Sequence, residues 1–434
     1  MRARSPARLV RLVGAAALLA AAGAGDAAAQ RTATALRATP ATGITCDKCH
    51  GNRDFLVGKG GPRGDSGLYV PAGILQDTRH ATLRCAQCHV GYDETYPHQA
   101  TAVVVACRTC HAEAGRAWES SIHASNQART GDAPTCVGCH GSHQVLGKDD
   151  RRSPSYPLNV AAMCGRCHAD PRIIGTYFAT ADKATARTAV DHFARTVHGN
   201  ALTRAGLVVS ATCNDCHRAH RVLPADSAGS SVNRANIPAT CGVCHTGVVA
   251  TYDSSAHGVA YRRGDSTSTG HGAPVCVDCH SAHEIVRADQ PRWLLGVVDE
   301  CGSCHERLVE TYFETYHGKV TRLGFNLAAT CADCHTPHDM RPASDARSSV
   351  FPGNREATCR RCHANANTNF VKYQPHGDSK DRAKYPLLYF AWLFMTLLLV
   401  GTMSFFLLHS ALWVMRSTIN RRRGTLPAHP ETPA

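Results

Sequence analysis

The 22 cysteines of this 434-residue chain all fall into eleven copies of the pattern Cys-x-x-Cys-His, numbered here as motifs 1 to 11 in chain order. The paired cysteines are Cys46 and Cys49, Cys85 and Cys88, Cys107 and Cys110, Cys136 and Cys139, Cys164 and Cys167, Cys213 and Cys216, Cys241 and Cys244, Cys276 and Cys279, Cys301 and Cys304, Cys331 and Cys334, and Cys359 and Cys362. The histidines that end the motifs are His50, His89, His111, His140, His168, His217, His245, His280, His305, His335 and His363. Any fold of this chain must therefore accommodate eleven equivalent sites.

The spacing inside each motif fits covalent attachment of haem c. Two thiols three positions apart can add to the two vinyl groups of one haem, while the next residue, histidine, binds the iron. Zinc ribbons, dithiol redox centres and disulfide frameworks also use Cys-x-x-Cys, but they do not require a histidine directly after the second cysteine. Because the histidine follows in all eleven copies, we expect eleven covalently bound haem c groups with iron.

The N-terminus has the residue order of a secretory signal peptide. Arginines within the first eleven residues precede an apolar run over residues 12–23, and three alanines end at Ala29. This order predicts a signal peptide over residues 1–29. Covalent haem attachment takes place outside the bacterial cytoplasm, so the signal and the motifs agree.

An apolar segment near the C-terminus is long enough to cross a membrane. Residues 387–415 contain no Asp, Glu, Lys or Arg, and a transmembrane helix needs only about 20 apolar residues. Arg416 and the arginines at 421–423 follow the segment, as is typical of a cytoplasmic flank. We expect a transmembrane helix over residues 386–415 and a cytoplasmic tail over residues 416–434, single-pass in the bacterial inner membrane.

Between the signal and the anchor we expect one periplasmic undecahaem domain over residues 30–384. Its motifs recur in dihaem repeats of about 60 residues. The formal net charge of the chain is +13, but the signal and the tail contribute +3 each, and every haem adds two propionates. Many Lys and Arg side chains should therefore pair with propionates, and no nucleic acid is expected as a partner.

Histidines outside the motifs recur at two positions. Some follow a motif histidine after a gap of mostly 12 residues, and others lie three residues after it, in Cys-x-x-Cys-His-x-x-His. This patterned set predicts a second axial histidine for every iron: His80, His98, His123, His143, His198, His220, His257, His283, His317, His338 and His376. We interpret His192 and His271, which lie outside the pattern, as polar surface residues.

The closely spaced histidines constrain which iron each one can bind. Residues three apart on a helix lie on one side, with Cβ atoms about 5–6 Å apart, whereas two axial ligands must approach one iron from opposite faces. The second histidines of this pattern are therefore expected to bind a neighbouring haem: His143, His220, His283 and His338. By exchange, histidines such as His123 and His257 are expected to cap the following haem.

The head resembles the bacterial multihaem c-type cytochromes of the cytochrome c3-like class. The Cys-x-x-Cys-His-x-x-His phrases at 136–143 and 276–283 and the Ser-x-x-His-Gly phrase at 254–258 carry the resemblance, which covers most of residues 44–378. It implies a mainly irregular chain with short α-helices packed around haems, almost no β-sheet, and a function in electron transfer. The tetrahaem quinol dehydrogenases place their anchor before the head, whereas here the anchor comes last.

An iron bound by two imidazoles has no vacant site for substrate, which favours an electron-transfer protein with no catalytic residue. The expected partners are a multi-span cytochrome b or another quinone-reactive subunit of the inner membrane, and periplasmic or extracellular electron carriers. His409 within the anchor could bind a shared haem b or contact a quinone, or it could simply lie near the membrane interface. We expect the chain to be tied to the membrane at its last haem, that of motif 11.

Two other functions remain open from the sequence. One is a multihaem reductase of a nitrogen or sulfur oxyanion, which would need an open haem. The other is a polymerising extracellular conduit, which the membrane anchor disfavours because an anchored subunit cannot stack without limit.

Overall fold

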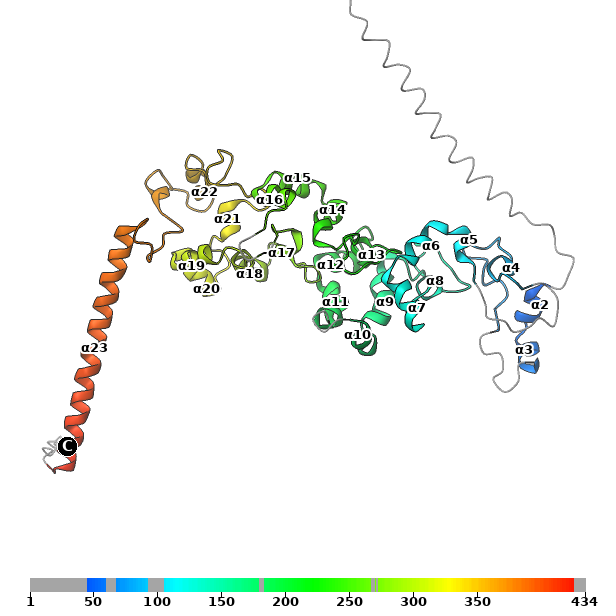
Figure 1. The fold of residues 1–434 in the computed structure, drawn as a ribbon, viewed down its shortest axis with the longest axis horizontal. Coiled ribbons are helices and arrows are strands. Elements are labelled where there is room, and N and C mark those ends of the chain that lie inside the picture. The colour runs from blue at the N-terminus through cyan, green and yellow to red at the C-terminus, as the bar shows by residue number, and fades with distance from the viewer. Residues whose placement is uncertain are drawn as a thin grey trace, which may run out of the picture. The chain divides into compact units, whose positions relative to one another are not determined.

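The computed structural model describes residues 45–59, 68–92, 105–178, 183–266, 270 and 272–424 (Figure 1). Within these residues the chain is helical or irregular and forms no β-strand, and its strand-like pairings are two isolated bridges, between His89 and Val105 and between Ser266 and Gly272. The fold class expected from the sequence is confirmed. The expected signal peptide, His98, His271 and the end of the tail from residue 425 lie outside the described residues.

The chain divides into two compact units. Unit 1 contains the described residues up to Gly115 together with Cys136–Ser153, and unit 2 contains Arg116–Thr135 and the described residues from Pro154 onward. The helices of unit 1 are α2 (Cys46–His50), α3 (Arg53–Lys59), α4 (Cys85–Cys88), α5 (Cys107–Cys110) and α8 (Cys136–His140), and α6 (Ala112–Glu119) spans the boundary.

Unit 2 holds the remaining helices, most of them short. They are α7 (Ile122–Thr130), α9 (Pro157–His168), α10 (Pro171–Tyr177), α11 (Lys183–Arg195), α12 (Val197–Thr203), α13 (Cys213–His217), the 3-10 helix η2 (Arg234–Asn236), α14 (Ile237–Gly242), α15 (Thr246–Ser254), α16 (Ala256–Arg263), α17 (Cys276–His280), α18 (Pro291–Gly302), α19 (Glu306–Glu314), α20 (Tyr316–Arg322), α21 (Cys331–His335), α22 (Arg355–Arg360), the 3-10 helix η3 (Phe370–Lys372) and α23 (Pro386–Arg422).

The motifs lie on helices in two ways. Motifs 6, 8 and 10 each begin a five-residue helix, in which an aspartate at the third position accepts the backbone N–H of the N-cap residue, as Asp215 does from Thr212 at 2.8 Å. Motifs 5 and 9 instead end longer helices, α9 and α18, that start earlier at Pro157 and Pro291. The expectation that helices begin at or just after the motifs is therefore only partly correct.

The protein's own side chains form a small core. A cluster of buried hydrophobic residues consists of Val297, Val298 and Tyr312, with partly buried neighbours such as Trp293 and Val309 packed against it. Such a core is small for a chain of this length, which fits a head whose interior is filled largely by haem.

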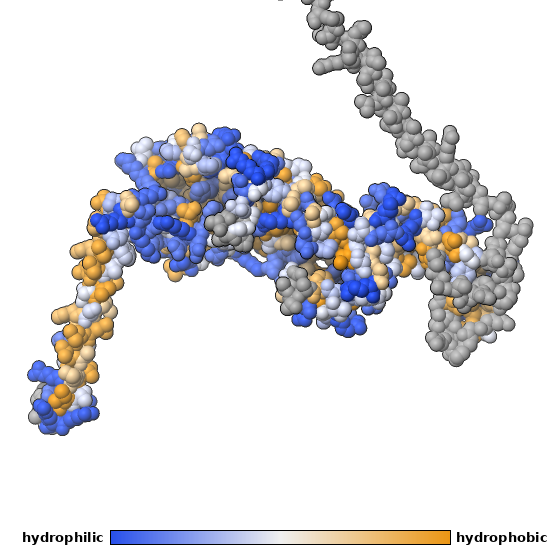
Figure 2. Space-filling model, viewed as in Figure 1, coloured by the Kyte–Doolittle hydropathy of each residue, from blue (hydrophilic) through white to orange (hydrophobic). Residues whose placement is uncertain are grey.

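The C-terminal helix α23 is apolar and unlike the rest of the chain. It is 37 residues long, and an 18-residue stretch of it has a mean hydropathy of 2.1, so it is long and apolar enough to cross a membrane. Figure 2 shows its hydrophobic surface between hydrophilic ends. The helix runs on to Arg422, seven residues beyond the expected end of the span at Met415. A membrane span ends where its apolar residues end, but a helix can continue beyond them. The end of the expected span and the end of the helix therefore differ.

Candidate functional site

Among the residues that the structure describes, nine pairs of histidine rings face each other at a nearly constant separation. Their centroids lie 5.9 to 6.4 Å apart. The pairs are His80–His111, His89–His143, His123–His168, His198–His245, His217–His283, His257–His305, His280–His338, His317–His363 and His335–His376. Two imidazoles that bind one metal from opposite sides, each through a bond of about 2 Å, place their centroids about 6 Å apart. Each pair therefore has the spacing of two axial ligands.

Every pair joins a motif histidine to a patterned histidine that lies near a different motif. His143, which follows motif 4, faces His89 of motif 2, and His338, which follows motif 10, faces His280 of motif 8. This facing of the rings is the arrangement that the predicted cross-ligation requires. In the other direction His123 faces His168 of motif 5, two motifs on, so the expectation that it serves the following motif is wrong by one motif.

The patterned histidines that pair forward lie in the first turn of a helix, except His80, which lies in a turn. These helix-borne histidines are His123 on α7, His198 on α12, His257 on α16 and His317 on α20. In each helix a buried Ser or Thr at the N-cap accepts a backbone N–H three residues on, at 3.0 to 3.2 Å. The cap fixes where the helix begins and therefore where its histidine lies.

Glycine directly follows three of these four histidines because no side chain fits there. A Cβ on Gly258 would overlap the carbonyl oxygen of Tyr252 at the end of the preceding helix, and Gly199 and Gly318 are equally crowded by Phe193 and Tyr312. The Ser/Thr-x-His-Gly phrase thus encodes a close approach between two successive helices. That approach sets the direction in which the histidine leaves the backbone.

The turn-borne histidines, His143, His283 and His338, are held differently. The helix of their motif ends at the motif histidine, and the next residue has a positive φ: Gly141 (81°), Ser281 (58°) and Thr336 (49°). The helical geometry assumed from the sequence for His-x-x-His is therefore wrong. Cross-ligation arises instead because the left-handed residue turns the chain away from its own motif.

Backbone hydrogen bonds tie the two kinds of histidine together in unit 2. In each case the residue before a helix-borne histidine donates its N–H to the carbonyl two residues after a Cys-x-x-Cys-His-x-x-His phrase. The bonds are Ile122 to Val222 (2.9 Å), Val197 to Ile285 (2.8 Å) and Ala256 to Met340 (2.7 Å). Because these bonds join segments far apart in sequence, they fix which motif each histidine can reach.

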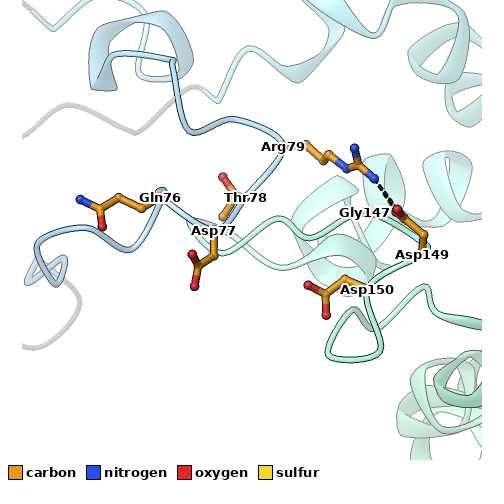
Figure 3. A pocket seen from close by; sticks show the side chains of 7 residues that line it. All are labelled: Gln76, Asp77, Thr78, Arg79, Gly147, Asp149 and Asp150. Atoms are coloured by element: carbon orange, nitrogen blue, oxygen red, sulfur yellow. Dashed lines mark hydrogen bonds and ion pairs between the residues drawn. The ribbon is translucent and has the colours of Figure 1, made fainter.

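Within unit 1, His80 is positioned by ion pairs between two loops. Arg79, the residue before it, donates to Asp149 at 2.7 and 2.5 Å (Figure 3). Arg152 lies 3.7 Å from Asp77. The hollow between the loops is lined by Gln76, Asp77, Thr78, Arg79, Gly147, Asp149 and Asp150. The lining of this hollow is polar, and the ion pairs across it hold the segment that carries His80 against the loop that follows motif 4.

Hydrogen bonds to Nδ1 leave Nε2 of the ligand histidines available to a metal. Nδ1 of His50 lies 2.9 Å from the carbonyl oxygen of Leu68, and Nδ1 of His376 lies 3.2 Å from the Thr311 hydroxyl. Since that hydroxyl donates to the carbonyl of Leu308, Nδ1 of His376 is the donor to Thr311. This arrangement fixes the tautomer that a metal-binding imidazole needs.

Burial favours the neutral form of several of these imidazoles. It is the largest cause that lowers the pKa of His123, His198 and His257, and the facing histidine lowers it further in each case. Burial, followed by His283 and His168, lowers the pKa of His217 to about 4. Neutral imidazole is the form that binds iron, so the electrostatics of the pairs suit coordination.

Successive motifs lie next to each other within each unit. Thiols of one motif interact with thiols of the next: Cys88 with Cys110, Cys107 with Cys136, Cys164 with Cys213, Cys216 with Cys244, Cys241 with Cys276, Cys279 with Cys301, Cys301 with Cys331 and Cys334 with Cys359. The attachment sites of motifs 2 to 4 in unit 1, and those of motifs 5 to 11 in unit 2, therefore follow one another in sequence order.

The residues present fit haem c. All 22 cysteines are described, none forms a disulfide, and none is buried, so each pair of thiols is open to thioether formation. Among the described residues no group of three or more His, Cys, Asp or Glu side chains is arranged to hold a metal ion by itself. A metal between two facing imidazoles needs further ligands from elsewhere, and a porphyrin supplies four.

The class III cytochrome C family matches the chain over residues 70–168, which span motifs 2 to 5. Over these residues, less than half of the chain, the protein is similar to multihaem cytochromes c. That similarity implies electron transfer through covalently bound haem. No curated protein and no solved structure matches the chain.

The ring pairs include 18 of the 22 predicted ligand histidines. His50 and His140 in unit 1 and His220 in unit 2 lie outside the nine pairs and have other interacting groups, and His98 lies outside the described residues. His192 is not paired with a motif histidine and binds Glu284 at 2.7 Å. Sequence reasoning did not identify the capping Ser and Thr residues or the residues with left-handed backbone conformation. The recurrent Ser/Thr-x-His-Gly phrase was a signal that could have identified the capping residues.

Proposed function

We propose that this chain is a membrane-anchored electron-transfer protein that carries eleven haem c groups, each closed on both faces by histidine. The observation that supports it best is the set of nine ring pairs with centroids 5.9 to 6.4 Å apart. Haem iron with two imidazole ligands exchanges single electrons between its ferric and ferrous forms and has no vacant position for a substrate.

The ligand set of the proposal is larger than the nine pairs. For His50, His98, His140 and His220 the ligand role rests on the sequence pattern that they share with the paired histidines. Every motif has its two cysteines and its histidine, so the count of eleven haems follows from the same pattern. The contacts between thiols of successive motifs support electron movement in sequence order within each unit.

The location that we propose is the bacterial inner membrane. The signal peptide over residues 1–29 would direct residues 30–384 to the periplasm, α23 would anchor them, and residues 416–434 would face the cytoplasm. The exposed apolar surface of α23 supports the anchor, because none of its side chains is buried against the rest of the chain.

The partner that we propose is a quinone-reactive membrane subunit, such as a multi-span cytochrome b, with periplasmic or extracellular carriers at the other end. His409 supports a shared haem b or quinone contact in the membrane. Its ring stacks on Phe405, one helical turn away, at 6.4 Å on a helix without buried side chains. An ionisable residue in a span usually has a functional partner. A His409→Ala variant that retains the full b-haem spectrum and quinol activity of the membrane complex would contradict this assignment.

Electron paramagnetic resonance of the purified full-length protein tests the proposed coordination. We expect only low-spin ferric signals, with a total of eleven haems by haem content. The matched control is His192→Ala, which removes a histidine outside the pattern and should leave the spectrum unchanged, whereas His257→Ala should convert one haem to high spin. A high-spin haem in the unmodified protein would instead favour an oxyanion reductase with an open site.

A further inference from the structure

The segment over residues 373–385, here called the strap, joins η3 to the membrane helix α23. It carries His376, whose ring lies 6.4 Å from that of His335 in motif 10. Residue 376 is ten positions before Pro386, the first residue of α23. The strap therefore contributes to a candidate iron site and also leads directly into the anchor.

The strap is fixed to α19 along much of its length. Arg307 at the start of α19 binds Asp378 at 3.0 Å, and the buried Ser379 donates to Glu314 at the end of α19 at 3.2 Å. Between them Thr311 holds Nδ1 of His376 at 3.2 Å. These bonds span the whole of α19, so the position of His376 is well defined relative to α19 and α21.

The same strap is in contact with the first turns of α23. Cδ2 of Leu388 lies 3.3 Å from the position that a Cβ would take on Gly377, the residue after the ligand histidine. The guanidinium of Arg382 lies over the ring of Phe390 at 5.4 Å. The start of the anchor thus packs beside the motif 10 site.

The motif 11 site is built from other parts of the chain. Its two histidines are His363 and His317, the second of them on α20, and the ring of His363 lies 5.0 Å from that of Phe370 of η3, tilted by 45°. His363 precedes α23 by 23 residues, whereas His376 precedes it by ten. Proximity in sequence made motif 11 the expected point of attachment, but the exchange of ligands between motifs brings the motif 10 site to the anchor.

We propose, resting on the proposed function, that electrons pass between the membrane partner and the head at the motif 10 site, between His335 and His376. The motif 11 site then lies off the direct path. Electron tunnelling slows steeply with distance, so the site packed against the anchor dominates exchange with a donor bound in the membrane. The donor class is a one-electron carrier within the bilayer, such as a semiquinone or a b-type haem.

A spin-label measurement tests the geometry without any assay of activity. A nitroxide is attached at Ala383→Cys, an exposed strap position, in the full-length protein. Ferric haem nearby accelerates relaxation of the nitroxide. We expect this acceleration to be largely lost when Cys331→Ser with Cys334→Ser removes the motif 10 haem and to be retained when Cys359→Ser with Cys362→Ser removes the motif 11 haem. The reverse pattern would overturn the proposal.

Electron throughput in native membranes tests the path, with menadiol as donor and ferricyanide as periplasmic acceptor. Removal of the motif 10 haem, by Cys331→Ser with Cys334→Ser, should lower the rate more than removal of the motif 11 haem does. An equal or larger loss without the motif 11 haem would overturn the proposal and leave the electron-transfer function intact. An unchanged rate in both variants would contradict the proposed function itself.

A second motif 11 variant covers the case in which haem removal disturbs folding. His317→Met keeps that haem and should raise its potential, because methionine in place of histidine favours ferrous iron. We expect a raised potential for one haem and a smaller loss of throughput than removal of the motif 10 haem causes. A loss of throughput as large as that one would show that electrons pass through motif 11, and the proposal would fail.

Discussion

The helix-borne and turn-borne histidines reach the same kind of pair through different local structures. A helix-borne histidine such as His257 follows a buried serine cap, precedes a crowded glycine, and faces the motif two positions further on. A turn-borne histidine such as His283 follows a left-handed residue and faces the motif two positions back. The direction in which a ligand reaches along the chain is therefore set by the few residues around it.

The two kinds together make the sites interdependent. Each helix-borne histidine faces a motif later in the chain, and each turn-borne histidine faces an earlier one. Hydrogen bonds such as Val197 to Ile285 join the segments that carry the two kinds of histidine. A change in one segment should therefore appear at a site two motifs away, and segments of each kind should respond to different substitutions.

The largest effect is expected for Gly258→Ala, which should damage a helix-borne histidine. The new Cβ would overlap the carbonyl oxygen of Tyr252, so α16 must shift and His257 must leave its position opposite His305. We expect a loss of about 3 kcal/mol in the free energy of unfolding, measured by denaturant titration, with one additional high-spin haem. Gly247→Ala is the matched control, since nothing lies within 4 Å of a Cβ there. Equal effects of the two substitutions would contradict the close-approach argument.

Removal of a helix cap should cost less. Ser255→Ala leaves the buried N–H of Gly258 without its acceptor at 3.1 Å, and we expect the free energy of unfolding to fall by about 1 kcal/mol. Ser255→Thr should retain most of the stability, because Thr196 and Thr315 occupy the same position on α12 and α20. If the threonine variant is as unstable as the alanine variant, the hydroxyl is not what holds the helix.

A turn-borne histidine should respond in the opposite sense to glycine. Ser281 has a φ of 58° and a ψ of −179°, which only glycine adopts easily, and Gly141 occupies the equivalent position after motif 4. Ser281→Gly should therefore raise the free energy of unfolding, by about 0.5–1 kcal/mol. The adjacent Ala282→Gly has no positive φ to relieve and should lower it. A more stable Ala282→Gly variant or a less stable Ser281→Gly variant would contradict the distinction between the two kinds of segment.

The smallest effect concerns pH and the loop after His143. Side-chain and backbone hydrogen bonds from Arg152 lower the pKa of Asp150 to about 2 from its ordinary value of 3.8. A carboxyl group with a lowered pKa stabilises the fold above its ordinary pKa, and that contribution disappears as the pH falls toward 2. Asp150→Asn should therefore be slightly less stable than the unmodified protein at pH 7 and no less stable at pH 2. Equal stability differences at both pH values would exclude this role for Asp150.

The sequence predicted the fold class and the histidines that form the ring pairs, but it did not predict which motif each second histidine faces. The motif histidines and the recurrent second histidines are visible in the chain itself. Their pairing across two motifs depends on hydrogen bonds such as Ile122 to Val222, between residues 100 positions apart, which no local pattern reveals. The non-helical His-x-x-His turns were missed because Ser281 and Thr336 adopt a positive φ that their residue types seldom adopt.

The segment that leads into α23 shows the same limit of prediction from sequence. Chain order placed motif 11 next to the anchor, whereas the contacts of Gly377 with Leu388 and of His376 with Thr311 bring the motif 10 site beside α23. Because a later segment carries the histidine that faces motif 10, the site nearest to α23 is not the one that comes last in the chain. Such reordering follows from the exchanged ligands and would be absent if every histidine served its own motif.

The measurement that tests the exchange of ligands most directly is His338→Ala in two backgrounds, followed by electron paramagnetic resonance. In the background without the motif 8 haem, Cys276→Ser with Cys279→Ser, the substitution should add no high-spin signal, because His338 faces His280 of that motif. In the background without the motif 10 haem, Cys331→Ser with Cys334→Ser, it should add one high-spin haem. A new high-spin haem only in the first background would mean that His338 serves its own motif, and it would contradict the account.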